Sequence, residues 1–224
     1  MLRWELVLIL LLAFAPGALG LLVLLVSGGS NGPPETKLGP ATATTVFDLF
    51  LSWAPVLVIA YVLARNREGW AAIGLGRLTA ADARTGVALG FASFWLVVLL
   101  SLVFSQFGTR SVDFLPTGLP LWFRAIDALT IAVTAGVTEE VVVRGYAQTR
   151  LEQLALPTAV VVLLPTALWG ILHLYEGAGA ALTIFCLGLM YAVYFNLTRR
   201  LWPLVLAHGL FDLTQLVLLL ASRH

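Results

Sequence analysis

Long and nearly uncharged runs of hydrophobic residues, separated by short polar segments, dominate this chain. A helix that crosses the bilayer core needs about 20 mostly apolar residues. Seven runs are of about that length, and they cover residues 4–27, 46–64, 85–106, 122–148, 157–175, 179–197 and 201–221. The runs are continuous rather than alternating, which indicates helices and not the strands of a membrane barrel. The pattern therefore predicts an all-α, polytopic transmembrane helical bundle of about seven spans.

The first run could be a signal peptide, because it begins with Arg3 and continues into an apolar stretch. However, apolar residues continue from Leu21 to Val26, and no polar mature sequence begins there. The run is longer than the apolar region of a signal peptide. We therefore expect it to be retained as the first span.

The positions of the basic residues predict the orientation, because Lys and Arg are enriched in cytoplasmic loops. With a cytoplasmic N-terminus, nine basic residues lie inside, namely Arg3, Arg65, Arg67, Arg77, Arg84, Arg144, Arg150, Arg199 and Arg200. Four then lie outside, namely Lys37, Arg110, Arg124 and Arg223. We therefore expect an N-in, C-out topology.

Composition supports a membrane protein, since 60% of the residues are hydrophobic and only 11% are charged. So little polar surface could not cover a water-soluble globule, which excludes a cytosolic enzyme. The net charge of +1 gives no basic field for nucleic acid. A single cysteine, Cys186, excludes an internal disulfide framework and a Cys-rich metal cluster. We expect one integral-membrane domain over residues 1–224, placed in the plasma or inner membrane, with its motifs within about 122–221.

Several ionisable residues fall inside the predicted spans. They are Asp48, Asp127, Glu139, Glu140, Arg144, His173, His208 and Asp212. An acid or an arginine at the centre of a spanning helix costs about 2.5–3.5 kcal/mol on insertion scales. These residues must therefore face the protein interior or a wet cavity, and such residues often mark a functional site.

The first motif is Glu139-Glu140-Val-Val-Val-Arg144. Glu140 and Arg144 share one helix face, in the favourable order of acid before base. Glu139 points about 100° away from Glu140. The spacing predicts that Arg144 holds one carboxylate while the other projects into a cavity. The alternative is that the three residues only tie helices together, but two adjacent acids would be a costly scaffold in a membrane helix.

Two further motifs place histidines on other spans. Trp169 and His173 are one turn apart, and so are His208 and Asp212. His208 and Asp212 could hydrogen-bond or share a ligand, and Gly209 leaves room for close approach of another helix. Each motif alone could be a buried structural pair. Together with the acidic pair, the two motifs favour a functional site.

Other acids are weaker candidates for the site. Asp48 and Asp127 are expected to act as hydrogen-bond partners between helices. Glu176 follows His173 by three residues, a spacing that metal ligands use. It falls at the predicted outer boundary, so we expect a solvated side chain.

A glutamate, two histidines and an aspartate around a wet cavity suit hydrolysis. A carboxylate can act as general base toward water, and a histidine can donate to the oxyanion of a tetrahedral intermediate. The same four residues, Glu139, His173, His208 and Asp212, could instead hold a divalent metal such as zinc with a bound water. The sequence does not distinguish these two mechanisms. It contains neither an HExxH helix nor a Gly-x-Ser-x-Gly elbow.

In this order, the three motifs resemble those of the CPBP family of intramembrane proteases, which comprises CAAX prenyl endopeptidases of type II and bacteriocin-processing (Abi) proteins. The family patterns are Glu-Glu-x-x-x-Arg, an aromatic residue three positions before a His, and His-x-x-x-Asn or Asp. The usual aromatic residue is Phe, and this chain has Trp169 there.

The resemblance implies an intramembrane endopeptidase. Glu139 and His173 would activate water, His208 and Asp212 would stabilise the oxyanion or position the peptide, and Glu140, Arg144 and Trp169 would support the site. The resemblance also implies a peptide or protein substrate, which is lipidated in the eukaryotic branch, and contact with membrane lipids. The role of a metal in the family is disputed, so a zinc cofactor stays open. We expect the site to open toward the cytoplasm, because the first motif lies near that end of its span.

Two alternatives use the same residues. One is a non-catalytic membrane immunity or scaffold protein, against which the complete set of motifs argues mildly. The other is a small transporter or proton relay, since such proteins also carry acids and histidines in their spans. The absence of internal repeat symmetry counts against the transporter.

Overall fold

The computed structural model describes residues 2–26, 37–109 and 118–222, and every regular element in these ranges is a helix. The longer helices are α1 (Leu2–Val26), α2 (Leu38–Arg65), α3 (Ala80–Phe104), α4 (Leu121–Glu139), α6 (Thr158–Leu172), α7 (Ala178–Thr198) and α8 (Trp202–Ser222). The shorter ones are η1 (Trp70–Ile73), η2 (Ser105–Phe107), η3 (Glu140–Gln148), α5 (Thr149–Gln153) and η4 (His173–Glu176). The prediction of an all-α bundle is confirmed.

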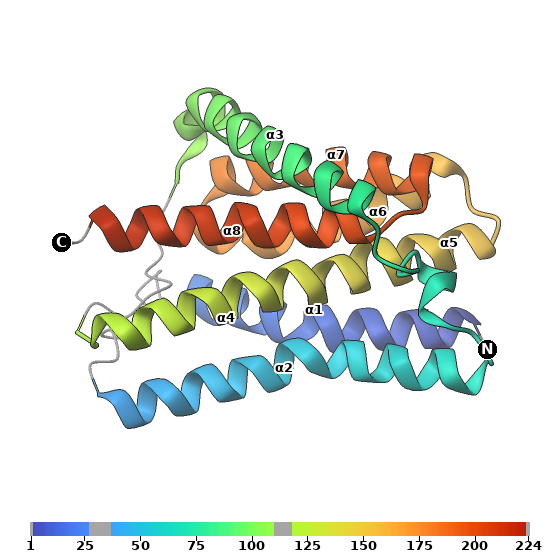
Figure 1. The fold of residues 1–224 in the computed structure, drawn as a ribbon, viewed down its shortest axis with the longest axis horizontal. Coiled ribbons are helices and arrows are strands. Elements are labelled where there is room, and N and C mark those ends of the chain that lie inside the picture. The colour runs from blue at the N-terminus through green and yellow to red at the C-terminus, as the bar shows by residue number, and fades with distance from the viewer. Residues whose placement is uncertain (1, 27–36, 110–117, 223–224) are drawn as a thin grey trace.

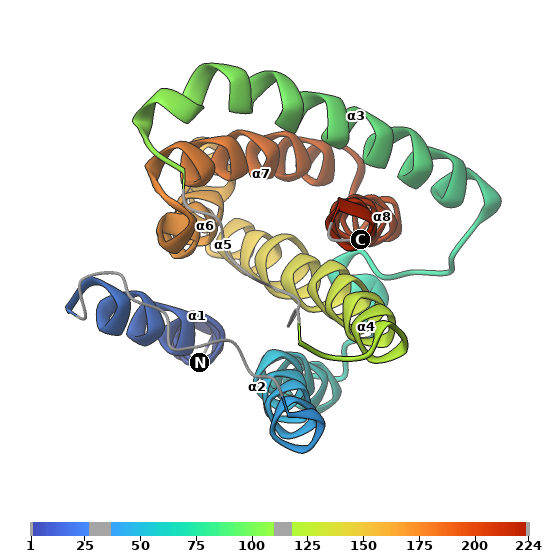
Figure 2. The ribbon, with the colours of Figure 1, turned by 90° about the vertical axis from the view of Figure 1, so that its left-hand side faces the viewer.

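Within the part of the chain that the structure describes, six helical segments are long and apolar enough to cross a membrane. The other predicted run, 122–148, forms α4 and η3 and is not among the six. It nevertheless lies in the middle of the bundle when the bundle is viewed end-on (Figure 2). Large apolar side chains such as Phe50, Phe91 and Leu102 face outward from the surrounding helices, as lipid contact requires.

α1 begins and α8 ends at opposite ends of the bundle (Figure 1). The end at which α1 begins is rich in arginines, and four ion pairs join its loops and helix ends, namely Arg65–Glu5, Arg150–Glu68, Arg199–Glu152 and Arg200–Asp82. We call it the arginine-rich end. The positive-inside rule assigns it to the cytoplasm, and the N-in, C-out topology remains a prediction.

Two glycines bring α4 and α8 close together. A Cβ on Gly136 would lie 2.8 Å from the backbone nitrogen of Gly209. No side chain can fit between these backbones, so the two helices touch along their main chains. The expectation that Gly209 permits close approach is confirmed, and this contact lies next to the first and third motifs.

After Glu139, α4 continues into the wider π-helical turns of η3 and then into α5. π-Helical segments are rare and are often found at functional sites. Every residue of η3 is buried, including Glu140 and Arg144. On α4 itself, Asp127 accepts a hydrogen bond of 2.9 Å from Thr45 of α2, as expected for a residue that joins two helices.

Candidate active site

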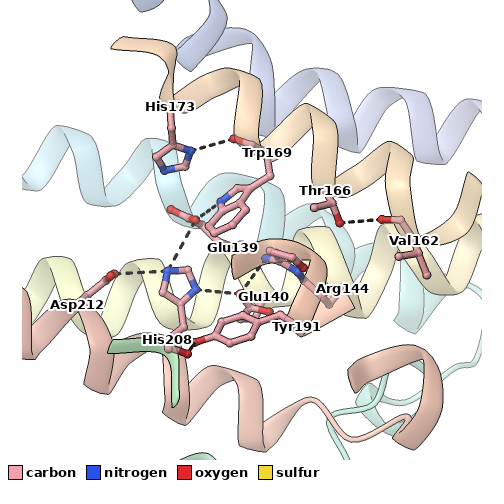
Figure 3. A network of polar contacts seen from close by, with 12 residues as sticks. Glu139, Glu140, Arg144, Val162, Thr166, Trp169, His173, Tyr191, His208 and Asp212 are labelled. Carbon is pink, nitrogen blue, oxygen red and sulfur yellow. Dashed lines mark hydrogen bonds and ion pairs between the residues drawn. The ribbon is translucent and has the colours of Figure 1, made fainter. Parts of the chain in front are cut away.

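The three motifs meet at one place in the bundle (Figure 3). Glu139 ends α4 and Glu140 begins η3, while Trp169 lies in the last turn of α6 and His173 begins η4. His208 lies within α8, four residues before Asp212. The helix packing thus brings together residues that are distant in the sequence.

Glu140 and Arg144 form a fully buried ion pair. Arg144 Nη1 donates to Glu140 Oε1 at 2.9 Å, and neither side chain is exposed. The same oxygen lies 2.8 Å from His208 Nδ1. Arg144 Nη2 also donates to the Gly188 carbonyl at 3.2 Å. The predicted pairing of Glu140 with Arg144 is confirmed, and it also fixes His208.

Glu139 occupies a different environment from its neighbour. Its side chain is 34% exposed, and its Oε2 lies 4.0 Å from His208 Nε2. The indole N–H of Trp169 donates a hydrogen bond to the same oxygen. The expectation that one carboxylate is held by the arginine and the other projects into a cavity is confirmed.

The two histidines have different partners. His208 Nε2 lies 3.5 Å from Asp212 Oδ2, and the imidazole is 6% exposed. His173 Nδ1 lies 2.9 Å from the Trp169 carbonyl. A carbonyl can only accept a hydrogen bond, so Nδ1 of His173 carries the hydrogen and a neutral ring keeps a lone pair on Nε2.

A cavity of about 360 Å³ adjoins these groups. All four predicted catalytic residues, Glu139, His173, His208 and Asp212, line it. The rest of its wall is mainly apolar, from α3, α4, α7 and α8. A second cavity of about 250 Å³ lies between α1, α2, α4, η3 and α6, and it shares Glu139, Trp169 and His173 with the first.

The larger cavity extends away from the arginine-rich end. Its lining includes Ser101 near the end of α3, Glu176 in η4 and Gln215 near the end of α8. These segments lie toward the opposite end of the bundle (Figure 1). The cavity thus lies on the far side of Glu139 from the arginine-rich end, because η3 and α5 continue the helix beyond Glu139 and fill that end with buried side chains. The opening of the site toward the cytoplasm stays a prediction.

Two residues next to His173 belong to the cavity and were not predicted. Tyr175 stacks on His173, with ring centroids 6.0 Å apart, and it lines both cavities. Glu176 is half-buried in the larger cavity, and not solvated as expected. α6 tightens into the 3₁₀ turn η4 at His173, which carries both residues along the cavity wall. The sequence carries only a weak signal of this turn, the glycine at position 177.

Tyr191 of α7 is a further buried residue that the sequence did not indicate. Its ring lies 6.1 Å from that of His208, and its hydroxyl lies 2.7 Å from Ser93 Oγ. Ser93 donates its own hydrogen to the Leu89 carbonyl, so Tyr191 must donate to Ser93. This contact links the site to α3.

The geometry of the site does not favour a metal ion. Within residues 2–26, 37–109 and 118–222, no group of three or more His, Cys, Asp and Glu residues is arranged to hold one. One of the expected ligand atoms, Glu139 Oε2, already accepts a hydrogen bond from Trp169. We therefore assign no step of the chemistry to a metal.

Comparison with known proteins supports the resemblance seen in the three motifs. The model of the family described as "Type II CAAX prenyl endopeptidase Rce1-like" matches residues 120–214. No curated protein and no solved structure matches the chain. The matched segment runs from the start of α4 into α8 and contains all seven residues predicted for the site. Residues 120–214 are thus similar to the Rce1-like family of type II CAAX prenyl endopeptidases.

Proposed function

We propose that this protein is an intramembrane endopeptidase in which Glu139 and His173 activate a water molecule and His208 with Asp212 stabilises the oxyanion. The main support is the convergence of these four side chains, from three separate helical segments, on one cavity. Ionisable groups inside a membrane bundle are energetically costly, and they usually mark a functional site. The proposed substrate is a peptide or protein, and a lipidated one is the expectation from the family.

In the first step, Glu139 acts as general base. Water gives a proton to its carboxylate, and the resulting hydroxide attacks the carbonyl carbon of the peptide bond. Nε2 of His173 can accept the second hydrogen of the water, because Nδ1 is the nitrogen that donates to the Trp169 carbonyl. The two residues together orient the attacking lone pair.

In the second step, negative charge on the former carbonyl oxygen needs a donor. Nδ1 of His208 donates to Glu140, so Nε2 can also donate only when the ring is protonated. The carboxylates of Glu140 and Asp212 lie 2.8 Å from Nδ1 and 3.5 Å from Nε2, so each ring nitrogen faces an acceptor. Glu139 then passes its proton to the leaving nitrogen, and the C–N bond breaks.

The test compares the wild type with Glu139→Ala in detergent. Both proteins are incubated with quenched fluorescent peptides, half of which carry a lipidated cysteine while the others have the same sequence without the lipid. We expect the wild type to cleave a subset of the peptides and the variant to cleave none. Equal cleavage by both proteins would contradict the proposal. Activity in cells that survives Glu139→Ala, without any cleavage, would favour an immunity or scaffold protein.

Metal chelation provides a separate prediction. Because the proposed mechanism has no metal step, excess chelator should leave the rate of cleavage by the wild type unchanged. The rate is measured after dialysis against chelator and again after addition of Zn²⁺ or Mg²⁺. Loss of cleavage that only Zn²⁺ restores would contradict this mechanism and would place the attacking water on a metal.

A further inference from the structure

Trp169 contacts Glu139 in a way that the usual phenylalanine of its motif could not. Its indole N–H donates a hydrogen bond to Glu139 Oε2, and a phenylalanine ring has no donor. The side chain is almost completely buried, with 4% of its surface exposed. It lines both cavities together with Glu139. The indole is therefore a polar partner of Glu139 as well as part of the wall.

Three neighbours restrain the indole ring. The Arg144 guanidinium lies over it, 4.4 Å from the ring centroid. Gly188 of α7 lies so close that a Cβ there would be 2.7 Å from two ring atoms. The His173 ring meets the indole edge-on, with centroids 5.1 Å apart. The indole cannot turn without displacing a buried charge or a helix backbone, so the direction of its N–H is fixed.

We propose, on the basis of the proposed function, that Trp169 is a positioning residue that orients the Glu139 carboxylate for proton abstraction. An indole nitrogen only donates, so it cannot take the proton itself. By holding Oε2 it leaves Oε1 as the oxygen that receives the proton from water. Among the described residues, no other side chain makes a hydrogen bond to Glu139.

This arrangement couples the two adjacent glutamates through Arg144. The guanidinium binds Glu140 through Nη1 and contacts the face of the Trp169 ring. The indole in turn binds Glu139. The Glu-Glu-x-x-x-Arg motif therefore sets the position of its own first glutamate indirectly, through a ring on α6.

The test uses Trp169→Phe, which keeps an aromatic ring and removes the donor. The matched control is Trp53→Phe, because the Trp53 indole also donates to α4, at 3.4 Å from Thr134 Oγ1, and Trp53 lines neither cavity. Melting temperatures in detergent show whether each variant folds. Gly188→Ala should displace the indole while keeping its N–H. It is therefore a second way to remove the hydrogen bond between Trp169 and Glu139.

We expect Trp169→Phe to lower kcat by about ten- to hundredfold, as loss of a hydrogen bond to a charged group implies, with little change in KM. Trp53→Phe should change neither kcat nor KM. An unchanged kcat, or a rise in KM alone, would overturn the proposal, since the ring would then only pack or bind substrate.

Ultraviolet resonance Raman spectroscopy tests the contact without any substrate. The indole N–H band reports hydrogen bonding, and Glu139→Ala should shift it in the wild-type background. The same change in the Trp169→Phe background should leave the spectrum unaltered. No shift in either background would overturn the proposal. If the wild type cleaves no peptide but the shift is present, the proposed function fails and the hydrogen bond to Glu139 stands.

Discussion

Changing each of the two adjacent glutamates to glutamine should impair two different properties, catalysis in one variant and stability in the other. Glu139→Gln should reduce kcat/KM by about 10³-fold or more, because an amide cannot accept the proton of water. The fold should be almost unaffected, since this side chain is 34% exposed and accepts one side-chain hydrogen bond. Glu140→Gln should instead lower the free energy of unfolding, because it removes the carboxylate that pairs with the buried Arg144.

Cleavage rates and thermal melting in the same detergent separate the two effects. The pair is well matched, because the two residues are neighbours in the chain and undergo the same chemical change. A Glu139→Gln protein that melts far below the wild type would show that Glu139 stabilises the fold. A Glu140→Gln protein of normal stability with no activity would instead place Glu140 among the reacting groups.

Arg144→Met should destabilise the protein by about 3–5 kcal/mol, the usual cost of breaking a buried ion pair. Methionine fills a similar volume but leaves the Glu140 carboxylate buried with only His208 as a side-chain partner. The variant also removes the guanidinium from the Trp169 ring and the donor from the Gly188 carbonyl. Unfolding titrations in mixed detergent measure the change in free energy.

The control for this variant is Arg199→Met. Arg199 pairs with Glu152 at the surface, where the side chains are 36% and 52% exposed, so its loss should cost no more than about 1 kcal/mol. The double variant Arg144→Met/Glu140→Gln should be more stable than the sum of the single changes implies, because it leaves no unpaired buried charge. Simple additivity would contradict the coupling between Glu140 and Arg144.

The sequence was sufficient for features that depend on local geometry. The apolar runs predicted the helices, because a membrane imposes a length and a composition on each span. The spacing of four residues predicted the contacts of Glu140 with Arg144 and of His208 with Asp212, because one helical turn brings such residues together. It also predicted that Glu139 and Glu140 point in different directions.

Only the tertiary structure decided how the motifs fit together. It placed His208 on Glu140, 68 residues away in the chain, and the Trp169 indole on Glu139, 30 residues away. It also placed the cavity on the side of Glu139 away from the arginine-rich end. These outcomes depend on the packing of whole helices, such as the close approach at Gly136. Spacing within one helix determines which side chains share a face, but it holds no information on which helix that face will meet.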